Sequence, residues 1–298
     1  MYLIKLLKKL INRLFEIDEL KRKNDDLKIL TSKILINQNS KKESKDINEH
    51  EFRAFSQFGE DGIIQFLIKN VKDIPKSFIE FGVEDYEESN TRFLLLNNNW
   101  SGLILDSDIK NINKIKKSYY YWKHDLIVQN KFIDIENINS IIEEYLKGKL
   151  LGILSIDIDG NDYWIFKKLD LEKFKPIFII SEYNSILGKE HSLTIPYKAD
   201  FIRQNNSVEK LYYGSSIKAI SNLAKEKGYS LLGSNLNGNN LFFVRNKYAN
   251  LFKVKSINDA YVKSKFKEFS NVNFEEGYNL LKSKDFYDTE TKKIFNFD

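Results

Sequence analysis

Between residue 51 and about residue 247, short apolar runs alternate with segments in which apolar residues recur at helical spacing. The runs are bounded by polar residues, as is typical of strands buried on both faces of a sheet. This alternation of strand and helix favours a doubly wound α/β sheet. Parallel strands are expected at 78–81, 102–106, 119–123, 151–157 and 176–181, and helices from about Gly59, from about Asn90, over 138–146 and over 215–227.

The last two expected strands, 229–232 and 241–244, flank a turn at Asn237, Gly238 and Asn239. Asn and Gly readily adopt the left-handed backbone conformations of tight turns, so this pattern predicts an antiparallel hairpin. Together the runs predict a Rossmann-like, doubly wound seven-stranded sheet that ends in a C-terminal antiparallel hairpin.

The two ends of the chain differ from this central region. We expect an amphipathic helical extension and a polar linker over 1–47, a Rossmann-like domain over 48–250, and a helical C-terminal extension over 251–298. The linker itself is expected over 37–48. Apolar residues recur at helical spacing through the first extension at Tyr2, Leu3, Leu6, Leu7, Leu10, Ile11, Leu14 and Phe15, and more loosely at Leu20, Leu27, Leu30 and Ile34.

The N-terminal helix has two interpretations. It packs on the body or pairs with a second subunit, which would make the protein a homo-oligomer. Alternatively, residues 1–15 lie on a membrane surface, because Lys5, Lys8, Lys9 and Arg13 alternate with their apolar side chains.

Composition narrows the class of protein. The 298 residues carry a formal charge of +5, which is too mild to indicate a nucleic-acid partner. The absence of cysteine excludes disulfides and thiol catalysis. No apolar run approaches the roughly 18 residues of a membrane span, and no signal cleavage site is evident. We therefore expect a soluble cytoplasmic protein, membrane-associated only if its N-terminal helix lies on a bilayer.

Acidic residues lie at or just beyond the ends of all five expected parallel strands. They are Glu80 and Glu84, Asp106 and Asp108, Asp125, Asp157 and Asp159, and Glu182. Ligands of open parallel sheets bind beyond the carboxyl ends of the strands, so these acids predict a ligand site there. The alternative for any one of them is a helix N-cap, a position that Asp fills well. Asp106, at the tip of its strand, is in the place where a carboxylate reaches a ribose diol.

The first strand delivers Glu80 and then Gly82, whose missing side chain lets the backbone approach a ligand closely. Two polar segments flank this strand. One is 56–62, with Gln57, Gly59 and Glu60, which frames the pocket or merely starts a helix. The other is Ser89, Asn90 and Thr91, which caps the next helix and points its N–H groups at an anionic ligand group.

Two further kinds of chemistry are expected at this edge of the sheet. Asp157, Asp159, Glu182 and Asn184 offer oxygen ligands that suit Mg²⁺, although Glu182 and Asn184 are alternatively helix caps. Asp157 then orients substrate without a metal. His191, in the loop after the fifth strand, is a candidate general base or simply an exposed loop residue.

Several motifs together resemble the FkbM-like methyltransferases. They are Ser-Gln-x-Gly-Glu-Asp at 56–61, Ile-Glu-Phe-Gly at 79–82, Glu-Ser-Asn-Thr at 88–91, Asn-Trp-Ser-Gly-Leu-Ile-Leu-Asp at 99–106, Ser-Ile-Asp-Ile-Asp-Gly-Asn-Asp at 155–162 and Glu-Tyr-Asn at 182–184. The resemblance covers about residues 52 to 247. It implies an S-adenosylmethionine-dependent O-methyltransferase, often one acting on sugars in polysaccharide or glycoside biosynthesis, so the expected acceptor is a small molecule or a glycan.

The resemblance also implies roles for individual residues. Glu80 and Gly82 belong to the first cofactor motif, Asp106 binds the ribose hydroxyls, Asp125 lies near the adenine, and Asp157 lies near the reaction centre as a catalytic residue. The glycine-rich loop of the family is reduced here to one glycine, and Asp159 replaces the more common Glu. The full set expected to bind the cofactor is Gln57, Gly59, Glu60, Glu80, Gly82, Ser89, Asn90, Thr91, Asp106 and Asp125.

Two other functions compete with methyl transfer. A non-catalytic Rossmann-like subunit of a polysaccharide assembly complex is compatible with the reduced glycine loop and the helical extensions. An NAD-dependent nucleotide-sugar enzyme would require a fuller glycine fingerprint than this chain carries.

Overall fold

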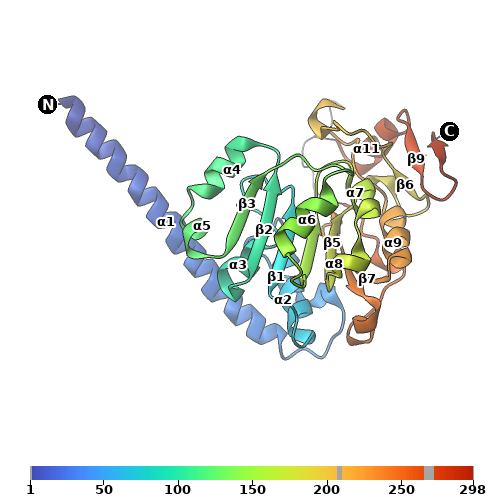
Figure 1. Cartoon of the computed structure of the whole chain (residues 1–298), viewed down its shortest axis with the longest axis horizontal. Coiled ribbons are helices and arrows are strands. Elements are labelled where there is room, and N and C mark those ends of the chain that lie inside the picture. The colour runs from blue at the N-terminus through green and yellow to red at the C-terminus, as the bar shows by residue number, and fades with distance from the viewer. Residues whose placement is uncertain (1, 207–209, 265–271, 298) are drawn as a thin grey trace.

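The structure is a computed structural model that describes residues 2–206, 210–264 and 272–297. A central sheet of seven strands has the order β3-β2-β1-β4-β5-β8-β7, in which the first five strands are parallel and the last two antiparallel (Figure 1). This confirms the expected fold class. The strands are β1 (Ser77–Phe81), β2 (Ser101–Asp106), β3 (Leu126–Asn130), β4 (Ile153–Ile156), β5 (Phe178–Glu182), β7 (Tyr229–Ser234) and β8 (Asn240–Arg245).

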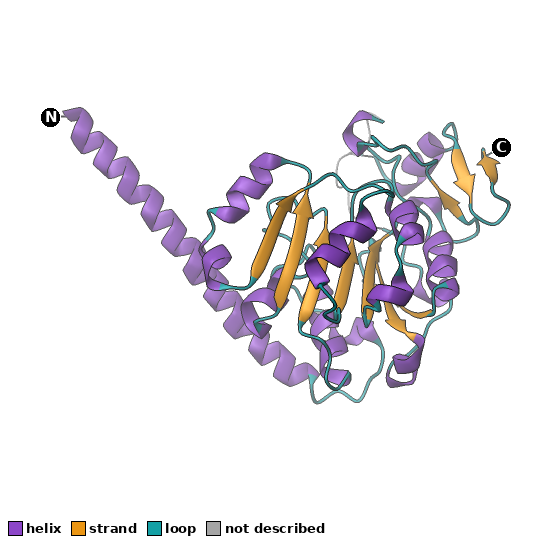
Figure 2. Cartoon of the chain, in the orientation of Figure 1, coloured by secondary structure: helices purple, strands orange, loops and turns teal. Residues whose placement is uncertain are grey.

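Helices cover both faces of this sheet, because successive side chains of each strand point to opposite faces (Figure 2). Ile79 and Phe81 of β1 join one buried cluster, whereas Phe78 joins the other. The first cluster includes residues of α6 (Ile138–Leu146), α7 (Asp162–Lys168), α8 (Leu171–Phe174), α9 (Ile217–Glu226) and α10 (Ile257–Ala260); the second includes residues of α2 (Glu60–Asn70), α3 (Arg92–Asn98), α4 (Ile109–Lys116) and α5 (Tyr119–Lys123).

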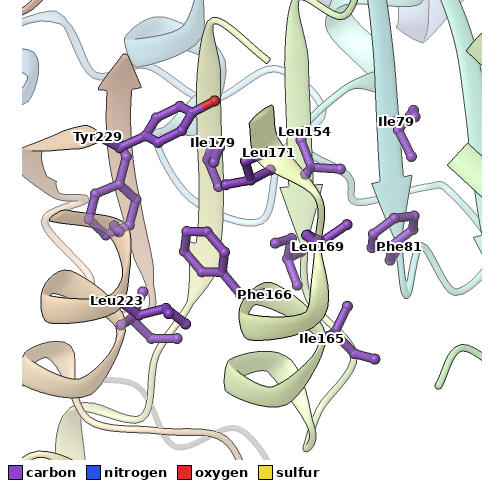
Figure 3. Close-up of a cluster of buried hydrophobic side chains, with 14 of the residues drawn as sticks. Ile79, Phe81, Leu154, Ile165, Phe166, Leu169, Leu171, Ile179, Leu223 and Tyr229 are labelled. Atoms are coloured by element: carbon purple, nitrogen blue, oxygen red, sulfur yellow. The ribbon is translucent and has the colours of Figure 1, made fainter. Parts of the chain in front are cut away.

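Figure 3 shows part of the first cluster, where α7 packs over the middle of the sheet. Phe166 and Ile165 of α7 belong to the same buried cluster as Leu154 of β4 and Ile179 of β5. The strands therefore have fixed positions, and the loops that follow them start from a rigid edge.

The segment 119–123 was expected to be a strand but is the short helix α5, and the third strand begins only at Leu126. Tyr119 and Tyr120 favour a strand by propensity. In the fold, however, Tyr119 donates a hydrogen bond to Asp25 and Tyr120 lies beneath the guanidinium of Arg92, 5.0 Å from ring centre to Cζ. These tertiary contacts outweigh the weak local preference.

The N-terminal extension is one continuous helix, α1 (Tyr2–Asn39), which runs diagonally along the body and projects beyond it (Figure 1). It extends into the segment expected to be a linker. Residues 40–46 of the expected linker are irregular and lead into a 3₁₀ turn, η1 (Ile47–His50). Among the described residues, none of the helices combines the length and apolarity that a bilayer crossing requires.

The C-terminal extension is only partly helical, contrary to expectation. After α11 (Phe274–Leu281) come two strands, β9 (Phe286–Asp288) and β10 (Lys293–Phe295), which form a separate antiparallel sheet with β6 (Leu193–Thr194). This sheet lies beside the segment that follows β5, so the end of the chain supports one wall of the site. Shorter helical elements are η2 (Ser185–Leu187), η3 (Arg203–Asn205) and η4 (Asn246–Leu251).

Candidate functional site

The chain reverses its direction of strand addition between β1 and β4, which are neighbours in the sheet. Such a switch point leaves a crevice beyond the carboxyl ends of the two strands. Gly82 follows β1 there with a φ of 70°, and a Cβ at this position would overlap the carbonyl oxygen of Asp157. A residue with a side chain would therefore separate the two strand ends, which explains why glycine occupies this position.

Glu80 lies beside this crevice, but its carboxylate is already hydrogen-bonded to other residues of the protein. Its carboxylate accepts hydrogen bonds from Ser89 Oγ at 2.6 Å, from the backbone N–H groups of Asn90 and Thr91 at 2.9 and 3.1 Å, and from Thr91 Oγ1. Burial raises the pKa of Glu80, although these hydrogen bonds lower it in part. Glu80 therefore fixes the start of α3, and it shapes the pocket more than it offers a free oxygen to a ligand.

Of the residues expected at the site in the segment before β1, one lines the crevice and two have structural roles. Gln57 lines the crevice, while Glu60 accepts hydrogen bonds from the side-chain amides of Asn235 and Asn240. Gly59 is the N-cap of α2. Asp61 accepts hydrogen bonds from three consecutive backbone N–H groups, those of residues 54–56. Gly59 and Glu60 are thus placed in structural roles, and Gln57 alone of the three expected residues faces the pocket.

Asp106 lies at the tip of β2, where the sequence indicated it. Its Oδ2 accepts a hydrogen bond from the backbone N–H of Glu84 at 2.8 Å, and its Oδ1 accepts one from that of Asp108 at 2.8 Å. Burial raises the pKa of this carboxyl group. These bonds join the loops after β1 and β2, and the carboxylate lines the larger of two hollows at this edge.

The larger hollow has a volume of about 450 Å³, within the range of about 300–1,000 Å³ typical of small-molecule sites. Gly82 and Asp106 are among the residues that line it. Its walls include two segments that sequence reasoning missed, 131–133 after β3 and 201–204 after β6. The first was missed because β3 was placed too early in the chain. The second follows β6, a strand of only two residues that leaves no recognisable pattern in the sequence, and no motif precedes it.

A smaller hollow of about 100 Å³ adjoins the larger one, and the two share Gly82, Glu84, Asp157 and Asp159. Its lining is mostly acidic or amide, and no Lys or Arg occurs among the residues described around it. Three carboxylates meet here: Asp157, Asp159 and Glu182 each offer an oxygen within 4.8 Å of the others.

Glu182 ends β5 and is 6% exposed, yet its Oε2 has no hydrogen-bond partner in the described structure. Burial, followed by the charges of Asp157 and Asp159, raises the pKa of Glu182 well above its usual range. Opposite Glu182 in the antiparallel pair lies Asn240, whose buried Oδ1 also lacks a partner. Two buried acceptors without donors mark a place where a ligand group or cation would bind.

Arg203 is a basic residue that lies beside this acidic group. Its guanidinium pairs with Asp159, lies 3.5 Å from the ring centre of Tyr213, and donates through Nε to the carbonyl of Lys210 at 2.7 Å. Its charge lowers the pKa of Glu182 and so offsets part of the acidic repulsion. Arg203 thereby fastens the wall segment 201–204 to the loop after β4.

That loop is shaped from beneath by Asp162, the first residue of α7. Its two carboxylate oxygens accept hydrogen bonds from the backbone N–H groups of Ile158 and Gly160 at 2.8 and 2.9 Å. Burial raises the pKa of Asp162 to about 6. The arrangement turns Asp157 and Asp159 toward the hollows.

Three expected site residues lie elsewhere. Asp125 precedes β3 and so lies at the amino end of the sheet, because the strand expected to end there is the helix α5. Asn184 caps η2 through Oδ1 and donates its amide hydrogens to the carbonyls of Leu211 and Tyr213, so its polar atoms are already bonded. It fits the helix-cap interpretation and not the metal one.

His191 is exposed, and its ring packs 4.8 Å from that of Phe295. It is not among the residues that line either hollow, so the structure does not bring it together with Asp157. Thr91, which was expected to bind the cofactor, is fully buried, and its hydroxyl and N–H donate hydrogen bonds to Glu80. Ser89 and Asn90 line the smaller hollow.

A seven-stranded sheet of this order, with a glycine and a carboxylate at the switch point and an acid at the tip of β2, defines an S-adenosylmethionine-dependent methyltransferase fold. The methyltransferase FkbM domain model matches residues 39–231, about two thirds of the chain. The chain therefore belongs to the FkbM methyltransferase family, as its motifs indicated. Residues 232–247 of the expected range lie outside the match.

A search of curated proteins found no match. Among solved structures, the N-terminal domain of EvdMO1 with SAH bound is 9% identical (TM-score 0.40; 64% of this chain, 80% of that one). An O-methyltransferase from Bacillus cereus in complex with SAH is 12% identical (0.36; 60% and 78%). An S-adenosylmethionine-dependent methyltransferase from Clostridium acetobutylicum is 10% identical (0.39; 62% and 90%). The family assignment rests on the family model and not on these structures.

Proposed function

We propose that this chain transfers the methyl group of S-adenosylmethionine to a hydroxyl of a sugar, in surface polysaccharide or glycoside biosynthesis. One observation carries the choice of acceptor. The small hollow that meets the larger one at Gly82 and Asp157 is lined by carboxylates and amides. These groups accept and donate hydrogen bonds to hydroxyls, whereas a phosphate or carboxylate on the acceptor would be repelled.

The larger hollow fits the nucleoside end of the methyl donor. Asp106 would accept hydrogen bonds from a ribose diol, and the apolar side chains of Phe132 and Ile133 would flank a base. Gly82 leaves room for the donor to pass from the larger hollow to the smaller one. Asp157 lies where the two meet and is the residue we assign to the reaction centre.

The acidic group supports a second part of the proposal, a bound Mg²⁺. Asp157, Asp159 and Glu182 would hold it, with the unpartnered amide oxygen of Asn240 in the place first assigned to Asn184. Hard oxygen ligands of this kind suit Mg²⁺. When bound, such an ion lowers the pKa of a hydroxyl that contacts it. The carboxylates themselves align the hydroxyl and attract its proton.

Calorimetry with S-adenosylmethionine and S-adenosylhomocysteine tests the first part. We expect binding that weakens about 10- to 100-fold in Asp106→Ala, since a hydrogen bond to a charged group is worth about 1.5–3 kcal/mol. Asp125→Ala is the matched control, because this exposed acid lies at the opposite end of the sheet and should not affect binding. Absence of binding by the wild type would contradict methyl transfer and favour a non-catalytic subunit.

The acceptor and the metal are tested separately. Methyl transfer from labelled donor to a panel of neutral and anionic sugars should favour neutral ones, and incorporation confined to anionic sugars would contradict the acceptor proposal. Chelation of divalent cations should abolish transfer while leaving S-adenosylhomocysteine binding intact. Unchanged transfer after chelation would remove the metal and leave the donor and acceptor proposals standing.

A further inference from the structure

One side of α1 carries exposed apolar residues that nothing in the described structure covers. Leu20, Leu27 and Ile34 are 64, 62 and 60% exposed, and Ile17 is 49% exposed. Leu20, Leu27 and Ile34 are spaced seven residues apart, and Ile17 precedes Leu20 by three. This is the a/d spacing of a coiled coil, with Ile17 at an a position and the other three at d positions.

The opposite side of α1 is already bonded to the body. Asp25 accepts hydrogen bonds from Arg92 and from Tyr119 Oη, both at 2.8 Å, and Arg92 is 2% exposed. Ile29 and Ile36 pack against the cluster that contains Phe55. At 100° per residue, this side lies roughly 140° around the helix from the a/d seam, so body and seam do not compete for the same face.

The sequence continues this repeat over part of the remaining helix. In the register set by Ile17 and Leu20, Leu3 and Leu10 fall at a and Leu6 falls at d, whereas Arg13 interrupts the d positions and Thr31 the a positions. Asn24, which is exposed, also falls at an a position. A single Asn at a is known to specify a parallel two-stranded register at some cost in stability. Glu16 at g would meet Lys21 at e of a second helix, with opposite charge, whereas the next such pair, Lys23 and Lys28, has like charge. Lys28 lies over the ring of Phe55 on the body, 5.0 Å from its centre.

We propose that α1 pairs with α1 of a second copy of this chain in a parallel two-stranded coiled coil. The seven-residue spacing and Asn24 at its centre favour a helical partner over a lipid surface. A helix that lies on a membrane needs a broad apolar face but no polar residue at the centre of it. The two catalytic domains would then be held side by side by a helix attached to each through Asp25 and Arg92.

The mass in solution is the first test. The full chain should have about 70 kDa, twice its 35.1 kDa, by light scattering. The double variant Leu20→Glu/Leu27→Glu should have the mass of one chain and keep the thermal stability of its catalytic domain. Leu150→Glu is the matched control, because Leu150 is equally exposed at 67% but lies on the body, and it should remain a dimer.

A crosslinking test separates parallel from antiparallel pairing, and it is clean because the chain has no cysteine of its own. In a parallel coil, position 24 faces position 24, so Asn24→Cys should form an interchain disulfide under mild oxidation. Lys33→Cys, at a c position on the same helix, should not. A dimer in which neither cysteine crosslinks would overturn the parallel arrangement.

A single-chain mass for the wild type, or a dimer unaffected by Leu20→Glu/Leu27→Glu, would overturn the proposal. Flotation with vesicles that contain anionic lipid examines the alternative. Vesicle binding by a wild type with the mass of one chain, lost in the double variant, would assign the seam to a membrane.

Discussion

Two buried glutamates end neighbouring parts of the same sheet edge, and their surroundings differ sharply. Glu80, the second-last residue of β1, is 4% exposed and accepts hydrogen bonds from Ser89, Asn90 and Thr91. Glu182, at the end of β5, is 6% exposed, and its Oε2 has no partner in the described structure. Burial raises the pKa of both carboxyl groups, but only at Glu80 do donors offset that cost.

This difference distinguishes an acid that stabilises the fold from an acid that is available to bind a ligand. A buried carboxylate surrounded by donors stabilises the fold, because removing it leaves those donors unpaired. A buried carboxylate facing other carboxylates destabilises the fold unless something else binds there. Position at a strand end alone does not distinguish the two; the donors around each acid do.

The largest effect is expected at Glu80. Glu80→Ala leaves the hydroxyls and N–H groups of Ser89, Asn90 and Thr91 without their buried acceptor and should lower the free energy of unfolding by about 3–5 kcal/mol. Urea denaturation measures this. The control is Glu88→Ala, which removes an exposed ion pair with Arg53 and should cost less than about 1 kcal/mol. Equal stabilities for the two variants would mean that Glu80 is not a scaffold residue.

At Glu182 we expect the opposite pattern. Glu182→Gln keeps the shape and removes a carboxyl group that ionises only at a cost beside Asp157 and Asp159, so the free energy of unfolding should stay within about 1 kcal/mol of wild type or rise. Methyl transfer should fall about 100-fold, or about 2.7 kcal/mol of barrier. Parallel unfolding and transfer assays measure both. Loss of both stability and activity in this variant would contradict the proposed difference between Glu182 and Glu80.

Arg203 provides a third test of this comparison, because its positive charge lowers the pKa of Glu182. Arg203→Gln removes the ion pair with Asp159 and the contact with Tyr213, and should lower the free energy of unfolding by about 1–2 kcal/mol. Added Mg²⁺ should then raise the melting temperature of the variant more than that of wild type. Arg203→Lys keeps the charge and should behave between the two; an identical response in all three proteins would contradict this role.

The smallest effect concerns Glu51, a half-buried glutamate away from the site. Burial raises the pKa of Glu51 to about 7, so its contribution to stability is present below about pH 4.5 and is lost as the pH rises through 7. Its Oε1 accepts hydrogen bonds from Asn48 and Leu236, which a glutamine oxygen can also accept.

Glu51→Gln should therefore be more stable than wild type at pH 8, by about 1 kcal/mol after allowance for solvent screening, and the two should converge near pH 5. Melting temperatures across this range measure it. Parallel curves would show that burial alone does not shift a glutamate in this protein.

Much of the sheet edge was predictable from sequence because local signals agree there. Apolar runs fix β1, β2, β4 and β5, and Glu80, Gly82, Asp106 and Asp157 follow from strand ends. The third strand was predicted at the wrong position because Tyr119 and Tyr120 favour a strand by local propensity. In the fold they are held in a helix by contacts with Asp25 and Arg92, which are distant in sequence.

Partners distant in sequence also explain what was missed in the site. Arg203 pairs with Asp159 across more than forty residues, and no spacing rule connects them. Asn240 faces Glu182 only because β8 is inserted beside β5. Asn184 looked like a ligand until its amide was found bonded to Leu211 and Tyr213.

The small sheet of β6, β9 and β10 has a consequence for the order in which the protein matures on the ribosome. The seven strands of the main sheet are complete at Arg245, before β9 and β10. The wall segment 201–204 is followed by Tyr212, whose hydroxyl donates to the carbonyl of Asp285, and β6 pairs with β9. A nascent chain can thus assemble the carboxyl edge of the main sheet early, while the wall beside it gains its support only when residues 285–288 emerge.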